Sequence, residues 1–275
     1  QVALSDHNSI SLVNADGTPM APKNLDELYE FAKKMTKGTG DVKDVYGFSW
    51  NFTNFAESQL QCAVAALGGK SHNEDGSPNL EAPEILDIFR FIKKCTADGY
   101  CSLGTITDTN AARSGLKAGT VAMLFEAASR ATEAKVDSIG DDAVILPFPN
   151  MEENGTYIFA HYAYMPRGCE VKDAVWAFMK EAVFTNEFAA FGANNYGKLP
   201  PMKRQYAELN EDFSQIQAWM ANPKTIGDVP WKDGSKYQAL LYEIEQALAT
   251  TDLTPEDAVK RLIAEGGKLD LKRIK

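Results

Sequence analysis

Four segments combine aromatic rings with amide, carboxylate or guanidinium groups at positions where loops are expected. They are residues 50–55, residues 126–130, residues 194–196, and the pair Trp231 and Tyr237 on either side of a Lys-Asp-Gly turn. Aromatic faces cover the C–H patches of a polyhydroxylated ligand, while planar amides and charged forks bind its hydroxyl pairs. These residue types therefore predict a binding site for a neutral sugar-like molecule. Packing inside the core is the alternative role for each of them.

Catalytic signatures are missing from the sequence. It contains no GxSxG, HExxH, GxxxxGK[ST] or GxGxxG pattern, so nothing predicts a known nucleophile, zinc site or phosphate loop. Carboxylate pairs stand at 141–142 and 152–153, in expected turns. In a glycosidase such pairs would have to converge across a cleft, and solvated loop charges are the simpler interpretation. We expect no catalytic residues and no enzyme, with a glycan hydrolase as the alternative from another class.

Histidine and cysteine are too scattered to predict a metal site. His7, His72 and His161 have no second histidine or cysteine at ligand spacing, so neither a metal nor a cofactor is expected. His72 falls in a polar loop and is expected to be solvated. His161 interrupts an aromatic strand, where it is either a hydrogen-bonded structural residue or a ligand contact.

Four cysteines are also too few for a disulfide framework. Cys95 and Cys101 flank a turn; they could pair in an oxidising compartment, or remain two separate, partly buried thiols.

Composition and charge exclude several classes. The 275 residues carry 28 Lys+Arg against 38 Asp+Glu, a net charge of −10, which argues against nucleic acid as a partner. No apolar run approaches the roughly 18 residues of a membrane-spanning helix. The first residues lack the pattern of a signal peptide. A globular chain with one or two domains is expected.

The elements that must position these groups alternate between helices and short strands. Helical periodicity with capping signals predicts helices over 25–35, 85–95, 171–182 and 237–248, and a last one that opens at Thr254-Pro255. Apolar runs predict strands over 46–50, 121–125, 144–148 and 157–165. This alternation predicts an α/β architecture.

Several motifs, taken in order, resemble the extracellular solute-binding proteins of ABC transporters, the group that includes bacterial maltose-binding proteins. The match runs from about Asn14 to the C-terminus, and seven motifs in one order are fairly specific. The motifs are PKNLDEL at 22–28, YGF at 46–48, LGG at 67–69, KAGTVAM at 117–123, LPFP at 146–149, KDAVWAF at 172–178 and GKLPP at 197–201, followed by the closing helix TPEDA at 254–258.

This resemblance implies a type II periplasmic-binding-protein-like fold, with two α/β lobes joined by a hinge that close on a ligand. Residues 1–149 and 202–275 would form the C-terminal lobe, and residues 150–201 would belong to the N-terminal lobe. Only 23 residues precede Asn24, where family members have on the order of a hundred. We therefore expect a fragment with an incomplete N-terminal lobe and without its secretion or lipoprotein signal.

The resemblance also implies a role: capture of a sugar or oligosaccharide for the permease subunits of an ABC importer, without catalysis, by a monomer outside the cell, either periplasmic or a cell-surface lipoprotein. A module that presents the ligand to a membrane receptor is the alternative use of the same fold. The family's cleft segment falls on 50–58, and its usual tryptophan is replaced near Ser129, so Trp231 or Tyr237 is the alternative stacking platform. The predicted ligand-binding residues are Trp50, Asn51, Asn54, Phe55, Glu57, Glu126, Ser129, Arg130, His161, Trp231 and Tyr237.

Overall fold

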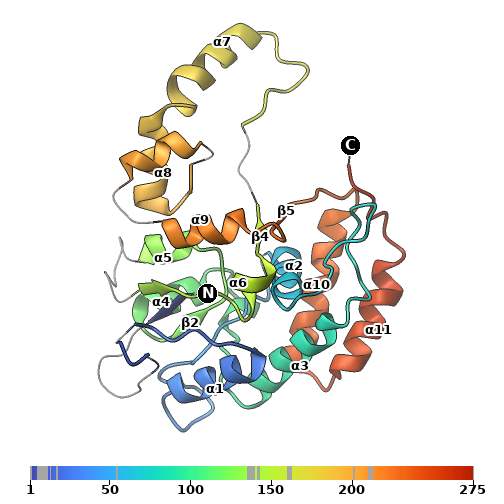
Figure 1. Ribbon diagram of the computed structural model, residues 1–275. Coiled ribbons are helices and arrows are strands. Elements are labelled where there is room, and N and C mark those ends of the chain that lie inside the picture. Colours follow the sequence, from blue (N-terminus) through green and yellow to red (C-terminus); the bar gives the residue numbers. More distant parts are fainter. Residues whose placement is uncertain are drawn as a thin grey trace.

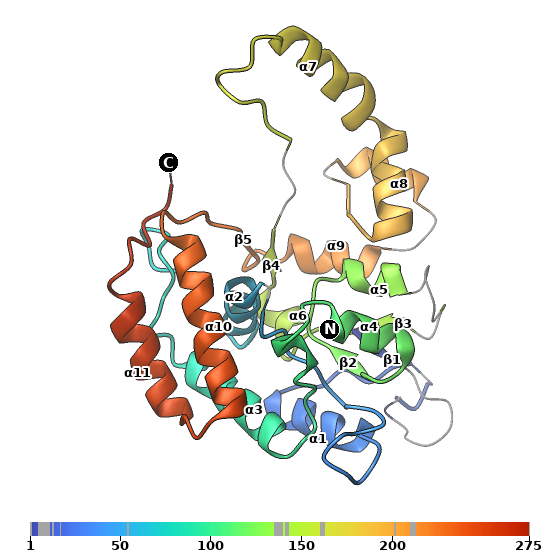
Figure 2. The same cartoon turned by 180° about the vertical axis from the view of Figure 1, so that it is seen from behind.

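The computed structural model describes residues 2–4, 12, 14–16, 18–53, 55–134, 140, 143–159, 163–200, 202–209 and 213–274. Most of the chain forms a helix-rich body, and residues 163–200 extend from this body as an arm (Figure 1, Figure 2). In the described part of the chain, the arm contains helical segments and no strand.

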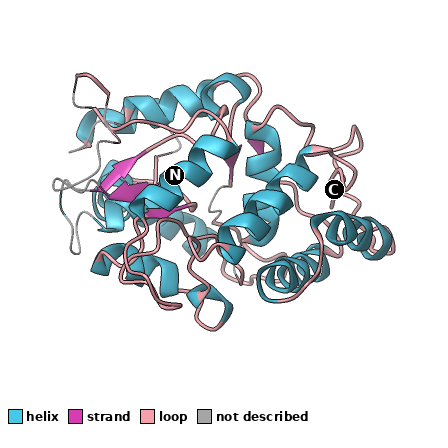
Figure 3. Ribbon diagram, turned by 90° about the horizontal axis from the view of Figure 1, so that it is seen from below, coloured by secondary structure: helices cyan, strands magenta, loops and turns pink. Residues whose placement is uncertain are grey.

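A small sheet lies on one side of the body (Figure 3). β1 (Val2–Leu4) lies between β2 (Met123–Leu124) and β3 (Ala143–Ile145) and is antiparallel to both. Residues 46–49 extend the sheet beyond β2: Ser49 bridges Leu124 in parallel, and Phe48 bridges Cys101 on the other side. Three of the predicted strands thus meet in one sheet, although each pairs over fewer residues than predicted.

Helices cover both faces of this sheet, as the α/β prediction requires. Met123 belongs to the main core, whereas Leu124 joins a second cluster with Leu116 and Ala131. Neighbouring strand residues point to opposite faces, which explains this division. Leu116 comes from α4 (Ala111–Ala118) and Ala131 from α5 (Ser129–Ala134), so these two helices cover the second face.

Five helices build the main core. They are α1 (Leu25–Met35), α2 (Ala56–Ala66), α3 (Glu84–Ala97), α10 (Gly234–Thr250) and α11 (Pro255–Gly266). The predicted capping signals are present: Asn24 accepts a hydrogen bond from the Glu27 N–H at 2.8 Å, and Thr254 accepts one from the Asp257 N–H at 3.1 Å. Of these five helices, all but α2 were predicted.

The sequence pattern missed several helices. They are α2 and α4, the short α5 and α6 (Met151–Asn154), α8 (Asn186–Tyr196) and α9 (Ser214–Ala221), with 3₁₀ turns at Gly104–Ile106 and Lys203–Glu208. α2 shows the reason, because it buries Gln59 and Gln61 together with Leu60 and Val64. A helix buried on most sides has no polar face, and periodicity then gives no signal.

Two predicted elements have different bounds. The helix predicted over 171–182 is α7 (Lys172–Phe178), which continues as a π-helical segment (Met179–Val183). Of the strand predicted over 157–165, residues 160–162 lie outside the described residues. In the described part of this range, the strand is β4 (Tyr157–Ile158), which pairs in parallel with β5 (Ile226–Gly227).

The arm exposes large apolar side chains to an unusual degree. Phe178 is 64% exposed and Trp176 is 50% exposed, and α7 buries no residue at all. A monomer rarely leaves such a concentration of apolar surface in water. The exposed large apolar side chains of the arm are Tyr164, Val171, Trp176, Phe178, Phe184, Phe188, Phe191 and Tyr196.

All four cysteines are free, so Cys95 and Cys101 are two separate buried thiols. Burial raises the pKa of Cys101 to about 12, which keeps this thiol protonated and unreactive at neutral pH. Among the described residues, no helix has the length and apolar character needed to cross a membrane.

Candidate functional site

The start of α2 holds an aromatic pair at the base of the arm. Phe55 precedes α2 in a left-handed conformation with φ of 61° and makes no side-chain cap. Its ring stacks on Phe159, which follows β4, with ring centres 5.8 Å apart and planes 20° apart. A bulky residue with positive φ is uncommon, and such conformations cluster at ligand sites. The backbone here therefore carries strain that presents one ring beside the segment leading to the arm.

Polar groups surround this pair. Glu57, in the first turn of α2, accepts a hydrogen bond from Gln238 at 2.7 Å. The Tyr157 hydroxyl in β4 donates to Asp228, just after β5, at 2.6 Å. Burial raises the pKa of Glu57, and the nearby Asp228 adds to this shift. The start of α2 and the two strands thus meet in one partly desolvated polar region.

A second polar group lies at α5. Glu126 accepts from both Nε and Nη2 of Arg113, at 3.1 and 2.8 Å, and its other oxygen accepts from the Ala127 N–H at 3.1 Å. Arg130 donates through Nη1 to both carboxylate oxygens of Glu133, at 2.6 Å each. The Glu126 side chain is only 4% exposed, so this ion pair is shielded from solvent.

Two atoms of α5 have unmet hydrogen-bonding capacity. The Ser129 hydroxyl and the Arg130 Nε are buried, and neither has a partner within the described part of the chain. Buried polar groups usually have partners, so each such atom needs an explanation, which a polar ligand or water would supply. Both residues were predicted as ligand contacts.

The base of the arm packs directly on α5. Gly197, with φ of 59°, caps the end of α8. A Cβ there would lie 2.7 Å from the Ser129 Cα, so only glycine permits this approach. Lys198 follows immediately, and burial lowers its pKa, with nearby Arg130 adding to the shift.

One side chain joins the two groups. Gln59 of α2 donates to the carbonyl of Phe125, the residue before Glu126, at 2.6 Å. Its own carbonyl oxygen is buried and lacks a partner among described residues. The hydrogen bond from Gln59 to Phe125 links α2 to the segment before α5, and we call Phe55, Glu57, Glu126, Ser129 and Arg130 the arm-base site.

The structure places the three predicted aromatic platforms in the core instead. The Trp50 ring has no exposed surface, lies 5.2 Å from Phe125, and donates from Nε1 to Glu245 at 3.1 Å. Trp231 donates to the Gly76 carbonyl at 2.8 Å and meets Tyr237 edge-on at 5.7 Å. Protein atoms cover these three rings in this conformation, and the aromatic rings that they contact at 5.2 and 5.7 Å belong to the core rather than to the arm-base site.

The remaining predicted residues divide as follows. Asn51 is buried, and its side chain accepts from the Thr53 N–H at 3.2 Å. Asn54 and His161 lie outside the described residues. Sequence reasoning missed five residues of the site. Lys198 had a sequence signal, namely its place in the GKLPP motif. The other four had none, because their roles depend on contacts distant in sequence; they are Gln59, Arg113, Glu133 and Phe159.

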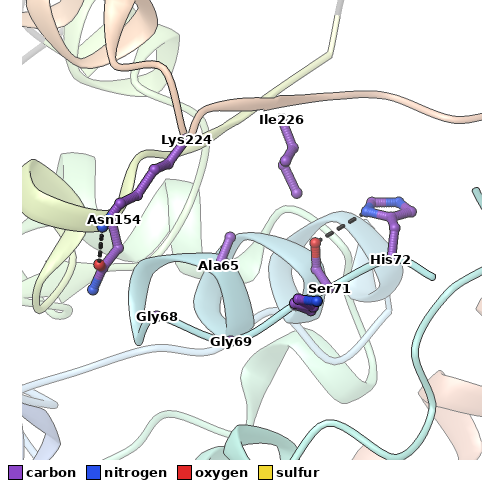
Figure 4. Close-up of a pocket in the computed structure, with 9 residues that line it drawn as sticks. Ala65, Gly68, Gly69, Ser71, His72, Asn154, Lys224 and Ile226 are labelled. Carbon is purple, nitrogen blue, oxygen red and sulfur yellow. Dashed lines mark hydrogen bonds between the residues drawn. The ribbon is translucent and has the colours of Figure 1, made fainter. Parts of the chain in front are cut away.

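A cavity of about 310 Å³ lies at the opposite end of α2 (Figure 4). Its polar side chains bond to one another: Lys224 donates to Asn154 at 3.1 Å, and the Ser71 hydroxyl lies 3.0 Å from Nδ1 of His72. His72 is half-buried rather than solvated, and burial lowers its pKa. None of the predicted ligand contacts lines the cavity. The lining residues are Ala65, Gly68, Gly69, Lys70, Ser71, His72, Asn154, Lys224 and Ile226.

Within the described ranges, no three His, Cys, Asp or Glu side chains are grouped so that they could hold a metal ion. The carboxylates at the arm-base site bond to Arg113, Arg130 and Gln238. This arrangement can hold a polar ligand through hydrogen bonds.

Comparison with known proteins identifies the family of this chain. The family described as bacterial extracellular solute-binding protein matches residues 6–241. No curated protein matches the sequence.

Solved structures share the fold. The match with maltose-bound MalE3 of T. maritima has 17% sequence identity and a TM-score of 0.71, and it covers 92% of this chain and 67% of the MalE3 chain. The match with a solute-binding protein of Agrobacterium radiobacter K84 in complex with ribitol has 19% sequence identity and a TM-score of 0.69, and it covers 97% of this chain and 68% of the other. The match with the Lmo0181 protein of Listeria monocytogenes in complex with cycloalternan has 18% sequence identity and a TM-score of 0.67, and it covers 91% of this chain and 64% of the other.

The chain thus spans about two thirds of the length of these structures, and it shares their periplasmic-binding-protein-like fold. The family match covers most of the chain. This protein belongs to the bacterial extracellular solute-binding proteins.

Proposed function

We propose that this protein captures a sugar or oligosaccharide for an ABC importer and releases it unchanged. Family membership supports solute capture. Structures with the same fold hold maltose, ribitol and cycloalternan, which supports a polyhydroxylated ligand. The permease subunits of the importer are the proposed partner of a monomer that works outside the cell, in the periplasm or as a surface lipoprotein.

The observation that carries this proposal is the arm-base site. Buried polar atoms of Gln59, Ser129 and Arg130 lack partners within the described residues, and the rings of Phe55 and Phe159 stack at the start of α2. Hydroxyl groups of a sugar can donate to the Gln59 and Ser129 oxygens and accept from the Arg130 N–H, while the face of an aromatic ring covers the C–H patches of the sugar.

The arm is proposed to be part of a second lobe. The resemblance to solute-binding proteins assigns residues 150–201 to the N-terminal lobe, and residues 1–149 and 202–275 to the C-terminal lobe. Because α6 and β4 pack on α2, we place the crossing point after Phe159. The apolar side chains that the arm exposes support this proposal, since a lobe needs such groups for its core.

Closure follows from the position of the site. A ligand held between α5 and the arm contacts both parts, so it stabilises the arrangement in which they are close. A ligand that contacts only one part binds both arrangements equally and shifts nothing. Selective closure of this kind would let a permease distinguish loaded from empty protein.

The test is thermal unfolding and intrinsic tryptophan fluorescence of the 275-residue chain against mono- and oligosaccharides. A saturable rise in Tm with one sugar class is expected, because a ligand that binds only the folded state stabilises it. Absence of a shift with every sugar would contradict the proposal. Release of new reducing ends would instead favour a hydrolase.

Replacing Phe55 with glycine should weaken sugar binding by about 1 kcal/mol, roughly fivefold in Kd, because a ring face is lost. The fold should be retained, since glycine adopts the 61° φ of this position without strain. Isothermal titration calorimetry measures the affinity, and urea unfolding measures the stability.

Phe178→Ala is the matched control for Phe55→Gly. This ring is 64% exposed on α7, away from the arm-base site, so the variant should bind as the parent does. Equal affinity of Phe55→Gly and the parent protein would remove Phe55 from the proposed site.

A further inference from the structure

The charged side chains around Lys198 have an excess of positive charge. The charged side chains that act on Lys198 are Arg130, Glu133, Arg113 and Glu126. Together with Lys198 they comprise three cations and two carboxylates, so the cluster carries one net positive charge.

Both carboxylates already accept hydrogen bonds from protein donors. Glu126 accepts three hydrogen bonds, two from Arg113 and one from the Ala127 N–H. Glu133 accepts from Arg130 through both of its oxygens. The two carboxylates form ion pairs with Arg113 and Arg130, and the Lys198 ammonium has no ion-pair partner among the described residues.

Three donors therefore remain: the Lys198 ammonium, the Arg130 Nε–H and the Ser129 hydroxyl. Ser129 is only 7% exposed and its hydroxyl has no described partner, so it can donate to a ligand without breaking an existing bond. Gly197 brings the arm within contact of Ser129, which places Lys198 next to it in the chain.

Burial lowers the pKa of Lys198 most and the neighbouring guanidinium of Arg130 adds to this shift, while Glu133 and Glu126 oppose it only in part. Burial and Arg130 both disfavour the ammonium form, and an anion placed beside it would reverse these effects. A neutral sugar supplies hydroxyl groups but no charge, so it would not offset the cost of keeping the Lys198 ammonium charged.

We propose that the captured sugar is acidic, and that its carboxylate is bound by Lys198, Arg130 Nε and Ser129 at the arm base. This inference rests on the proposed function and adds the substrate class, a uronic acid or an oligosaccharide that contains one. A carboxylate carries one negative charge, which matches the single excess positive charge of the cluster. A phosphorylated sugar carries nearly two at neutral pH and matches it less well.

Calorimetric titration of the whole chain tests this, with glucose, glucuronate, galactose, galacturonate, digalacturonate, maltose and glucose 6-phosphate. At least one acidic sugar should bind tenfold or more tightly than its neutral counterpart. This preference should shrink when the salt concentration is raised, because salt screens exposed charges.

Variants assign the preference to the cluster. Lys198→Met should reduce the affinity for the acidic sugar about tenfold with little change for the neutral one, and Lys198→Arg should restore most of it. Lys180→Met, which removes an exposed lysine of the same arm, is the control and should bind like the parent protein.

The outcomes separate the two proposals. Equal or tighter binding of neutral sugars overturns the acidic-sugar inference and leaves sugar capture intact. Tightest binding of glucose 6-phosphate overturns the carboxylate assignment. A preference for acids that survives in Lys198→Met overturns the role of this cluster. Failure of every sugar, acidic or neutral, overturns both proposals.

Discussion

Trp50→Ala is expected to lose about 3–5 kcal/mol of unfolding free energy, the usual range when a large aromatic side chain is removed from a core. The ring has no exposed surface and packs at 5.2 Å from Phe125. The variant also leaves Glu245 without its only described hydrogen-bond donor, which adds to the loss. Urea unfolding followed by circular dichroism measures the change.

Two controls separate packing from other effects. Trp50→Phe keeps most of the ring and removes the N–H, so it should lose much less stability than the alanine variant. Trp176→Ala removes a half-exposed tryptophan from the arm and should stay within about 0.5 kcal/mol of the parent protein. If Trp50→Ala were as stable as the parent but failed to bind sugar, Trp50 would be a stacking platform after all.

Glu245→Gln is expected to stabilise the protein at pH 8 by about 3 kcal/mol, because ionising an incompletely paired carboxyl in a core is costly. Glu245 is fully buried, and only one of its oxygens has a described partner, Nε1 of Trp50. Burial raises the pKa of Glu245 well above its ordinary value of 4.5, and the nearby Glu57 adds to the shift.

The direction of the pH dependence follows from this raised pKa. Above pH 4.5 the folded protein holds a proton that the unfolded chain releases. The parent protein should therefore lose stability as the pH rises from about 5 through the raised pKa of Glu245. Glutamine cannot ionise, so thermal unfolding of Glu245→Gln should depend less on pH over this range.

Measurement at pH 4.5 is the internal control for Glu245→Gln. There the carboxyl is protonated in the fold, and the variant should differ little from the parent protein. Glu57→Gln controls for the second acid, whose pKa is raised in the same direction. A Glu245→Gln variant with the same pH dependence as the parent would show that Glu245 is charged in the fold.

Local patterns were enough to predict the elements whose faces differ in polarity. α1, α3, α10 and α11 each bury an apolar stripe, and Asn24 and Thr254 cap two of them as predicted. α2 escaped prediction because tertiary packing buries its glutamines as well as its apolar residues. Burial of this kind depends on neighbours distant in the chain, such as Phe125, which accepts from Gln59.

The predicted site residues also differ in how far local sequence could place them. Residue types at loop starts drew attention to Phe55, Glu126, Ser129 and Arg130, which belong to the proposed arm-base site. The same reasoning included Trp50, Trp231 and Tyr237, since an aromatic residue after a strand serves equally well in a core or in a cleft. Only the fold shows that protein atoms cover these three rings.

The sequence by itself determined the α/β class, the capped helices and the resemblance to solute-binding proteins, because these depend on periodicity and on short ordered motifs. Tertiary structure alone decided which aromatic rings are buried, that Arg113 holds Glu126 across 13 residues, and that Gly197 brings Lys198 to α5. The physical reason is that burial and charge pairing act through space, whereas periodicity acts along the chain.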